Sequence, residues 1–243
     1  MHALSPREVL CLWEWGQDRH PLERALGFLA VAYPDASWEE LVHLNIGQRD
    51  ARLLTLRELT LGPRLQGFDE CPRCGERLEF ALAVADFRSP ARVDGEERRL
   101  EVEGFEVHFR LPNSLDLATV ARYEDPAKAH HRLLRNCILE VRYGEESVEV
   151  DGLPESVHAA LAYRMEEVES QANLRLELTC SECESVWFVL LDIASFFWGE
   201  ISVLAKRLLR DVHNLARAYG WREADILAMS AVRRGFYLEI VAG

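Results

Sequence analysis

Apolar residues recur with helical spacing in the first 64 residues. The run Ser5-Pro6-Arg7-Glu8 is a capping box with proline at the first helical position, and it predicts a helix that begins there. Pro21 opens a second predicted helix, which ends near Pro34, and Ser37-Trp38-Glu39-Glu40 caps a short third helix. A fourth predicted helix stops at Gly62-Pro63, and its apolar positions are Leu53, Leu54, Leu56 and Leu59. Residues 1–64 are therefore expected to form a small helical unit.

The pattern changes to strand-like alternation in two distant segments. In residues 65–94 the alternating apolar positions are Leu78, Phe80, Leu82 and Val84. In residues 174–192 they are Leu174, Leu176 and Leu178, followed by the run Trp187-Phe188-Val189-Leu190. Each segment contains one Cys-x-x-Cys pair, so the two are expected to be the halves of one ribbon.

Residues 95–173, between these halves, predict an inserted α+β subdomain. Leu100–Val102 and Phe105–Phe109 alternate around Gly104 and predict a hairpin. Two helices follow, with apolar stripes of Leu134, Cys137, Ile138 and Val141 and of Val157, Ala160, Leu161 and Met165. A short hairpin is expected between them at Val148 and Val150, and Arg88–Arg99 is expected to be a flexible loop.

Residues 193–243 predict C-terminal helices. The first is long, and its stripe consists of Phe197, Ile201, Leu204, Leu208, Val212, Leu215 and Tyr219. Gly220 ends it, and two short helices follow at Glu223–Met229 and Val232–Ile240, the latter capped by Ser230.

Two Cys-x-x-Cys pairs, Cys71 with Cys74 and Cys180 with Cys183, carry the candidate chemistry. Four thiolates are the ligand set of structural Zn²⁺, and each tight turn brings two sulfurs onto one metal. Between the pairs lie 105 residues, against roughly 15–20 in a compact two-knuckle motif. The prediction is one structural Zn²⁺ per chain, in a mainly helical α+β protein built around a zinc ribbon that the α+β subdomain splits.

The two cysteine turns differ in the residue that follows the second cysteine. Gly75 accepts the left-handed backbone expected there, whereas Glu184 would adopt it at a cost of about 1 kcal/mol. The alternatives to zinc are a redox dithiol, a pair of disulfides in a secreted protein, and cysteines that bind no metal. Neither pair has the strand-to-helix context of a thioredoxin motif, and Met1–Leu12 lacks the apolar region of a signal peptide. Cys11 and Cys137 lie on apolar helical stripes and are expected to be buried thiols rather than ligands.

No catalytic pattern accompanies the cysteines. Four cysteine ligands leave no open position for a catalytic zinc. The sequence also contains no His-x-Glu of the zinc deaminases, no H-E-x-x-H, no G-x-S-x-G and no phosphate-binding G-x-x-x-x-G-K-S/T. A non-enzymatic protein is expected.

Charge and hydropathy restrict the partners. The formal net charge of −13 argues against a general nucleic-acid binder, which needs a surface that attracts phosphate. The charge is uneven, since residues 201–243 carry +3 and the other residues −16. The longest apolar run, Val186–Gly199, is interrupted by Asp192 and is too short to cross a bilayer. A soluble, cytoplasmic protein without membrane insertion is expected.

Two runs of residues carry a resemblance to a known family. Arg49-Asp50, Leu53-Leu54, Leu56-Arg57-Glu58 and Gly62, followed by Cys71-Pro72-Arg73-Cys74-Gly75, resemble the baseplate hub assembly proteins of contractile-tailed phages and phage-like injection systems. The run Ala216–Trp221, with Ile226–Ser230, Arg233-Arg234 and Tyr237–Glu239, is similar to the ending shared by such tail proteins. The resemblance covers about residues 45–75 and 174–243.

This resemblance implies a structural or chaperone-like assembly protein of a contractile tail baseplate. Its expected partners are baseplate, hub or spike proteins and no nucleic acid, and it either joins the tail-like particle or leaves after assembly. Candidate partner-binding residues are Trp221, Arg233, Arg234 and Tyr237, a combination enriched at interface hot spots. The alternative for these residues is a tail packed on its own domain. The alternative function is a zinc-ribbon nucleic-acid-binding or regulatory protein.

Overall fold

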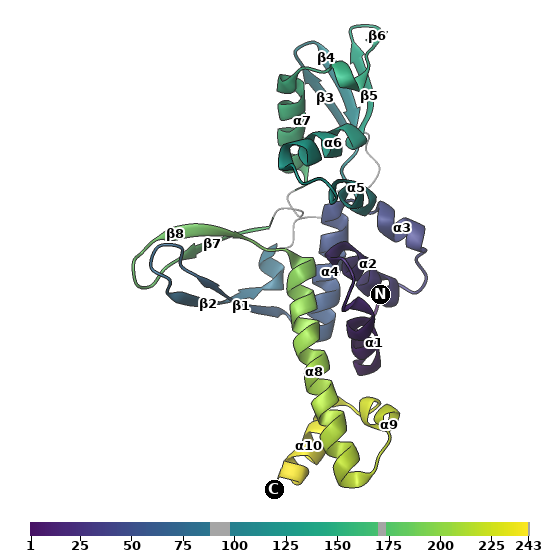
Figure 1. Ribbon diagram of the computed structural model, residues 1–243, viewed down its shortest axis with the longest axis vertical. Coiled ribbons are helices and arrows are strands. Elements are labelled where there is room, and N and C mark those ends of the chain that lie inside the picture. Colours follow the sequence, from purple (N-terminus) through teal and green to yellow (C-terminus); the bar gives the residue numbers. More distant parts are fainter. Residues whose placement is uncertain (88–97, 170–173, 243) are drawn as a thin grey trace. The chain divides into compact units, whose positions relative to one another are not determined.

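The computed structural model describes residues 1–87, 98–169 and 174–242, which form helices and small antiparallel sheets (Figure 1). The chain divides into two compact units. One consists of Met1–Ser37, Arg52–Arg64 and Asp192–Gly243, and the other of Trp38–Ala51 and Leu65–Leu191. The N-terminal and C-terminal helices, which the sequence presents as separate segments, thus share a unit, and residues 38–51 group with the ribbon and the insert.

The first unit is helical. It contains α1 (Pro6–Gly16), α2 (Pro21–Ala32), α8 (Ile193–Tyr219), α9 (Glu223–Leu227), α10 (Ala231–Ala242) and the part of α4 (Ile46–Leu61) from Arg52 onward. The capping box at Ser5 is confirmed: its side chain accepts from the Glu8 N–H while the Glu8 carboxylate accepts from the Ser5 N–H. Helix α2 begins at Pro21 as predicted, with His20 as its cap.

The core of the helical unit surrounds α8, which packs against α1, α2, α9 and α10. Phe28 of α2 and Phe197 of α8 are almost fully buried, with ring centroids 4.7 Å apart. Arg57 is also buried, and its Nε donates to Glu200 Oε2 at 2.9 Å, so the guanidinium is paired rather than exposed. Of the leucines predicted on α4, Leu53, Leu54 and Leu56 are buried and Leu59 is exposed.

Helix α8 ends where the sequence predicted. Gly220 adopts the left-handed conformation (φ 68°), and its N–H donates to the Ala216 carbonyl. The short helices α9 and α10 follow, and the Arg233 N–H donates to Ser230 Oγ at 3.2 Å. No helix among the described residues is long and apolar enough to span a membrane.

The second unit contains the inserted subdomain. Its antiparallel sheet has the order β3 (Arg98–Val102), β4 (Phe105–Phe109), β5 (Ile138–Tyr143), β6 (Glu146–Ser147). The helices of this region are α5 (Ser114–Val120), α6 (Pro126–Cys137) and α7 (Glu155–Val168), preceded in the unit by α3 (Trp38–His43), and a 3₁₀ turn spans Val150–Gly152. Val107, Phe109, Cys137 and Leu161 belong to one buried cluster that joins β4, α6 and α7. The predicted hairpin around Gly104 and the helix at Val157–Met165 are confirmed.

One predicted helix in the insert is too long. The stripe Leu134, Cys137, Ile138 and Val141 was expected to be continuous, but α6 ends at Cys137 and Ile138–Tyr143 is strand β5. The β-branched residues Ile138 and Val141 are both buried in the apolar cluster of the insert, since a register shift opposite His108–Phe109 interrupts the alternation of β5 between them. Strands β4 and β6 pair with the two edges of β5. The predicted hairpin at Val148 and Val150 is correspondingly shifted, since the turn joins β5 to β6 and Val150 lies in the 3₁₀ turn.

Two further expectations have mixed outcomes. Cys137 is fully buried as expected, and burial raises the pKa of its thiol to about 12. Cys11 is exposed, contrary to expectation, because α1 turns its buried neighbours Leu10 and Leu12 toward the core and Cys11 toward solvent. The predicted loop lies outside the described residues, except that Arg98 and Arg99 begin β3.

Candidate metal centre

Two hairpins position the four cysteines. Strand β1 (Arg64–Glu70) pairs with β2 (Arg77–Ala83), and β7 (Arg175–Thr179) pairs with β8 (Val186–Leu190). Cys71 and Cys74 lie in the turn between β1 and β2, and Cys180 and Cys183 lie in the turn between β7 and β8. The hairpins lie side by side in Figure 1, so segments about a hundred residues apart in sequence present their turns to each other.

Each hairpin buries part of one face, and one side-chain hydrogen bond joins the two. Leu65 of β1 and Leu176 and Leu178 of β7 are buried. Trp187 of β8 donates its Nε1–H to Asp69 Oδ2 of β1 at 2.8 Å, which links the two hairpins next to their cysteine turns. No pattern in the sequence predicts this bond, because the two residues are 118 positions apart.

The two cysteine turns have the same backbone. The Gly75 N–H donates to the Cys71 carbonyl at 2.9 Å, and the Glu184 N–H donates to the Cys180 carbonyl at 3.1 Å. Gly75 has φ 76° and Glu184 has φ 57°, so both adopt the left-handed conformation that the sequence predicted for this position. Glu184 keeps it despite its Cβ, at a cost of about 1 kcal/mol.

The four sulfurs converge. All four Sγ atoms lie within 4.8 Å of one another, with Cys71 3.6 Å from Cys183 and Cys74 3.5 Å from Cys180. A tetrahedral zinc with Zn–S bonds of about 2.3 Å requires sulfurs about 3.8 Å apart, whereas a disulfide requires about 2.05 Å. The donor set and its spacing therefore fit a metal ion of the zinc type rather than two cross-links.

The four cysteines differ in their burial and in the pKa values of their thiols. Cys71 and Cys180 are buried, Cys183 is half-buried and Cys74 is exposed. Burial acts to raise the pKa of Cys71, but hydrogen bonds from the Cys74 and Arg73 N–H groups to its sulfur prevail and lower the pKa to about 6. The Glu76 N–H acts to lower the pKa of Cys74, but its hydrogen bonds with the thiols of Cys183, Cys180 and Cys71 prevail and raise the pKa to about 12. The low pKa of Cys71 favours its thiolate, which is the form that binds a metal ion. A bound cation would also favour the thiolate form of the other cysteines, because it would offset the repulsion between neighbouring negative sulfurs.

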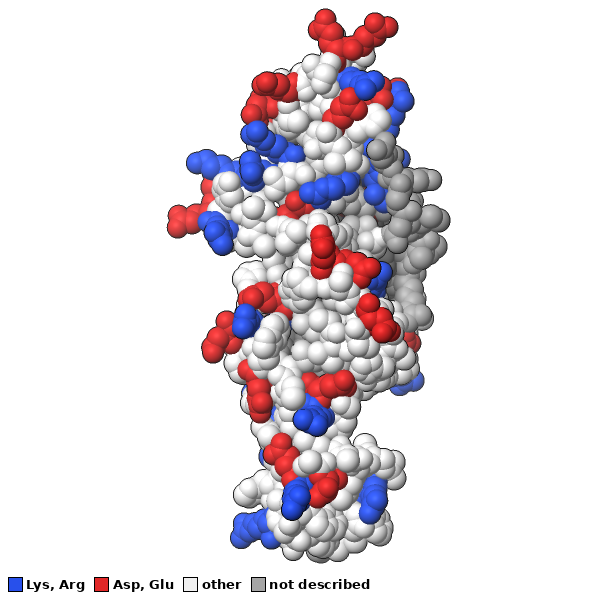
Figure 2. All heavy atoms as spheres, turned by 90° about the vertical axis from the view of Figure 1, so that its right-hand side faces the viewer, with Lys and Arg blue, Asp and Glu red and all other residues white. Residues whose placement is uncertain are grey.

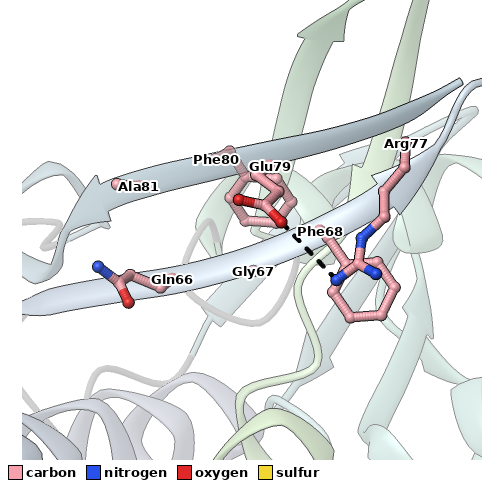
Figure 3. Close-up of a pocket in the computed structure, with 7 residues that line it drawn as sticks. All are labelled: Gln66, Gly67, Phe68, Arg77, Glu79, Phe80 and Ala81. Carbon is pink, nitrogen blue, oxygen red and sulfur yellow. Dashed lines mark ion pairs between the residues drawn. The ribbon is translucent and has the colours of Figure 1, made fainter.

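The outer faces of the hairpins expose apolar side chains. On β8, Val186, Phe188 and Leu190 are more than half exposed, and on β1 Phe68 is 58% exposed. Figure 3 shows the outer face of β1–β2, where the Arg77 guanidinium lies 3.8 Å from the Phe68 ring centroid and pairs with Glu79. The cavity there has a volume of about 390 Å³ and is open to solvent, and Glu79 is the one carboxylate among its seven lining residues.

The four candidate partner-binding residues lie in the helical unit and differ in exposure. Arg234 is 7% exposed, and its Nε–H donates to Asp211 Oδ2 of α8 at 3.2 Å. Trp221 and Tyr237 are half-buried and their rings meet edge to face, with centroids 4.9 Å apart. Arg233 is exposed, with its guanidinium 5.8 Å from the Tyr237 ring centroid. Arg234 thus packs on its own unit, while the other three residues reach the surface.

Comparison with known proteins identifies a family. A sequence model of the family described as T4 bacteriophage base plate protein matches residues 16–198. No significant similarity to a curated protein or to a solved structure is found. The match spans the cysteine turns and the insert. It confirms the expectation of a phage baseplate protein, but it does not distinguish the hub assembly proteins within that group. The chain belongs to the T4 bacteriophage base plate protein family.

Proposed function

We propose that this chain is a non-enzymatic structural or assembly protein of a contractile tail or injection-system baseplate, in which one structural zinc ion joins the two hairpins. Membership of the baseplate family indicates a structural or assembly role among tail proteins. The observation that carries the zinc proposal is the convergence of four Sγ atoms within 4.8 Å from two hairpins distant in sequence. Cys71, Cys74, Cys180 and Cys183 would hold the ion, which would supply fixed geometry without an open coordination position.

The test of the zinc proposal is metal content with a matched cysteine control. Protein purified under reducing conditions should contain one zinc per chain, and Cys183→Ser should lose it together with thermal stability. Cys11→Ser removes an exposed cysteine outside the cluster and should change neither. Absence of metal in the wild-type protein, or equal zinc loss in both variants, would contradict the proposal.

The distribution of charge supports protein partners over nucleic acid. On the face drawn in Figure 2, Lys and Arg side chains are interspersed with Asp and Glu rather than gathered into a basic stripe. A nucleic-acid interface needs a basic footprint, and the net charge is −13. We therefore propose baseplate, hub or spike proteins as partners of a cytoplasmic protein that acts during tail assembly.

The C-terminal helices are the proposed contact with such a partner. Among the candidate residues, Trp221, Arg233 and Tyr237 are accessible, whereas Arg234 is paired with Asp211. Arg233→Glu should weaken co-purification with the baseplate partner while the fold stays intact. Arg234→Glu should instead destabilise the helical unit by about 3–5 kcal/mol, because a carboxylate at this buried position would lose the pair with Asp211 and face a like charge. Normal co-purification of the Arg233→Glu protein would remove Arg233 from the contact.

Whether the chain stays in the tail has a direct readout. Mass spectrometry of purified tail particles should detect the chain in proportion to the other baseplate proteins if it is a structural component. If it acts as a chaperone, deletion of the gene should abolish complete baseplates although mature particles lack the chain. Complete baseplates without the gene would contradict both roles.

A further inference from the structure

Helix α10 has one face covered by its own unit. Arg234 on this face donates to Asp211 of α8 and, through Nη1, to the Met229 carbonyl at 3.3 Å. Tyr237 packs its ring against Tyr219 and Trp221, with centroids 5.8 Å and 4.9 Å away. These contacts fix which side of α10 faces inward.

The opposite face of α10 carries an exposed apolar row. Val232, Phe236 and Ile240 are 85%, 61% and 54% exposed. Their spacing of four residues places them on one ridge of the helix, here called the α10 ridge. Single exposed apolar side chains are common, but a continuous row is typical of an association surface.

Charged residues flank the α10 ridge in a defined order. Arg233 lies three residues before Phe236 and Glu239 lies three residues after it, and both are exposed. With 3.6 residues per turn, these positions fall on opposite sides of the ridge. One side of the ridge therefore carries the positive charge of Arg233, near the start of the helix. The other side carries the negative charge of Glu239, near its end.

We propose that the α10 ridge binds the α10 ridge of a second copy of this chain, with the two helices parallel about a two-fold axis. In this arrangement Phe236 meets Phe236 of the second copy. Each flank then combines Arg233 of one copy with Glu239 of the other. The two positions differ by six residues, or about 9 Å of helical rise, a distance that the long Arg and Glu side chains span together. Parallel coiled coils use similar opposite-charge pairs beside their apolar seam.

The charges select this orientation over the antiparallel one. An antiparallel pair with the same apolar contact would place both Arg233 side chains on one flank and both Glu239 side chains on the other. Like charges at short distance oppose association, whereas opposite charges favour it and set the orientation. The ridge is thus self-complementary in both apolar spacing and charge.

The expected association is weak. The 12 residues of α10 span about 18 Å, and one ridge buries less than the roughly 800 Å² per partner of a standard interface. The dimer should therefore form with rising concentration rather than be obligate. The family match ends at residue 198. This proposal shares Arg233 with the partner contact proposed above but does not rest on it, because Phe236 and Ile240 do not belong to that contact.

Sedimentation velocity of the full, metal-loaded chain over a range of concentrations tests the proposal. The average mass should rise from 27.8 kDa toward twice that value. Phe236→Ser and Ile240→Ser should each raise the concentration at half-association about tenfold or more. Val203→Ser, which removes a 67% exposed valine from α8, is the matched control and should leave it unchanged. Circular dichroism and thermal melting verify that each variant is folded, and Ile240→Ser decides the outcome if Phe236→Ser unfolds.

A charge exchange tests the orientation. Arg233→Glu or Glu239→Arg alone should weaken association several-fold by placing like charges on a flank, and the double exchange should restore it. Failure of the double exchange to restore association would reject the parallel pair. A wild-type chain that stays monomeric, or dimerises equally well without Phe236, would overturn the proposal. Binding of the monomer through Phe236 to anionic vesicles or to a purified baseplate protein would assign the ridge to that partner instead.

Discussion

The inserted subdomain and the cysteine hairpins are both small antiparallel structures, but they are stabilised differently. The insert buries one face of a four-stranded sheet with an apolar cluster that includes Val107, Phe109 and Leu161. The hairpins have two strands each and leave Val186, Phe188 and Leu190 of β8 exposed. An isolated two-stranded hairpin is at best marginally stable in water, whereas a sheet packed on helices is self-sufficient. The cysteine cluster thus lies at the turns of the two-stranded hairpins and not within the apolar cluster of the insert.

Metal removal should give the largest difference between the two regions. Chelation under reducing conditions should abolish amide-exchange protection in β1–β2 and β7–β8 and leave β4 and β5 protected. The loss of protection should be large, because structural zinc in zinc-finger peptides binds with about 10–16 kcal/mol of apparent free energy, which contributes directly to folding. Hydrogen exchange followed by mass spectrometry resolves the regions. Equal loss of protection in the insert would show that the two regions fold as one cooperative unit.

Truncating a side chain in the apolar cluster of the insert should destabilise the insert and leave the cysteine hairpins unchanged. Phe109 is 1% exposed within the apolar cluster of the insert, and Phe109→Ala should lower the free energy of unfolding by about 3–5 kcal/mol. Zinc content should stay at one per chain because no cysteine ligand belongs to that cluster. Denaturant unfolding and elemental analysis measure the two quantities. Zinc loss in this variant would mean that the hairpins depend on the insert.

A buried carboxyl should make the stability of the insert depend on pH. Burial raises the pKa of Glu169 to about 7, although its Oε1 accepts from the Gly47 N–H at 3.0 Å. The folded state therefore holds a proton that the unfolded chain loses at its ordinary pKa of 4.5, so stability decreases as pH rises from about 4.5 to 7. Glu169→Gln should raise the free energy of unfolding by on the order of 1–3 kcal/mol at pH 8 and by nearly nothing at pH 4. A gain that is the same at both pH values would rule out this titration.

The smallest effect should come from the two cysteine turns. Glu184→Gly removes a side chain from a residue with φ 57° and should stabilise the zinc-bound protein by at most about 1 kcal/mol. Gly75→Ala, at φ 76°, should destabilise it by a similar amount. Thermal melts at fixed zinc concentration compare them. Opposite signs are the expected outcome, and destabilisation by both changes would show that the Glu184 side chain makes a compensating contact.

The local signals in the sequence predicted much of the fold. Residues a few positions apart decide a helix start at Ser5, a helix end at Gly220 and the turn after Cys71, because caps and left-handed turns are local backbone interactions. Periodicity located α8 and the hairpin at Gly104 for the same reason. It failed at Ile138–Tyr143, where β4 and β6 supply the backbone partners of a strand and override an apparent helical stripe.

The sequence by itself determined which four cysteines form the candidate metal site. Each Cys-x-x-Cys motif is short, so ligand type and spacing can be recognised from neighbouring residues. Only the tertiary structure decided which side chains face inward. Cys11 is exposed although it lies on an apolar stripe, and Arg234 is buried although it adjoins the exposed Arg233. Whether such a residue is buried depends on the helix that packs against its face, and that helix comes from elsewhere in the chain. For Arg234 the neighbouring helix is α8, whose Asp211 lies 23 residues away in the sequence.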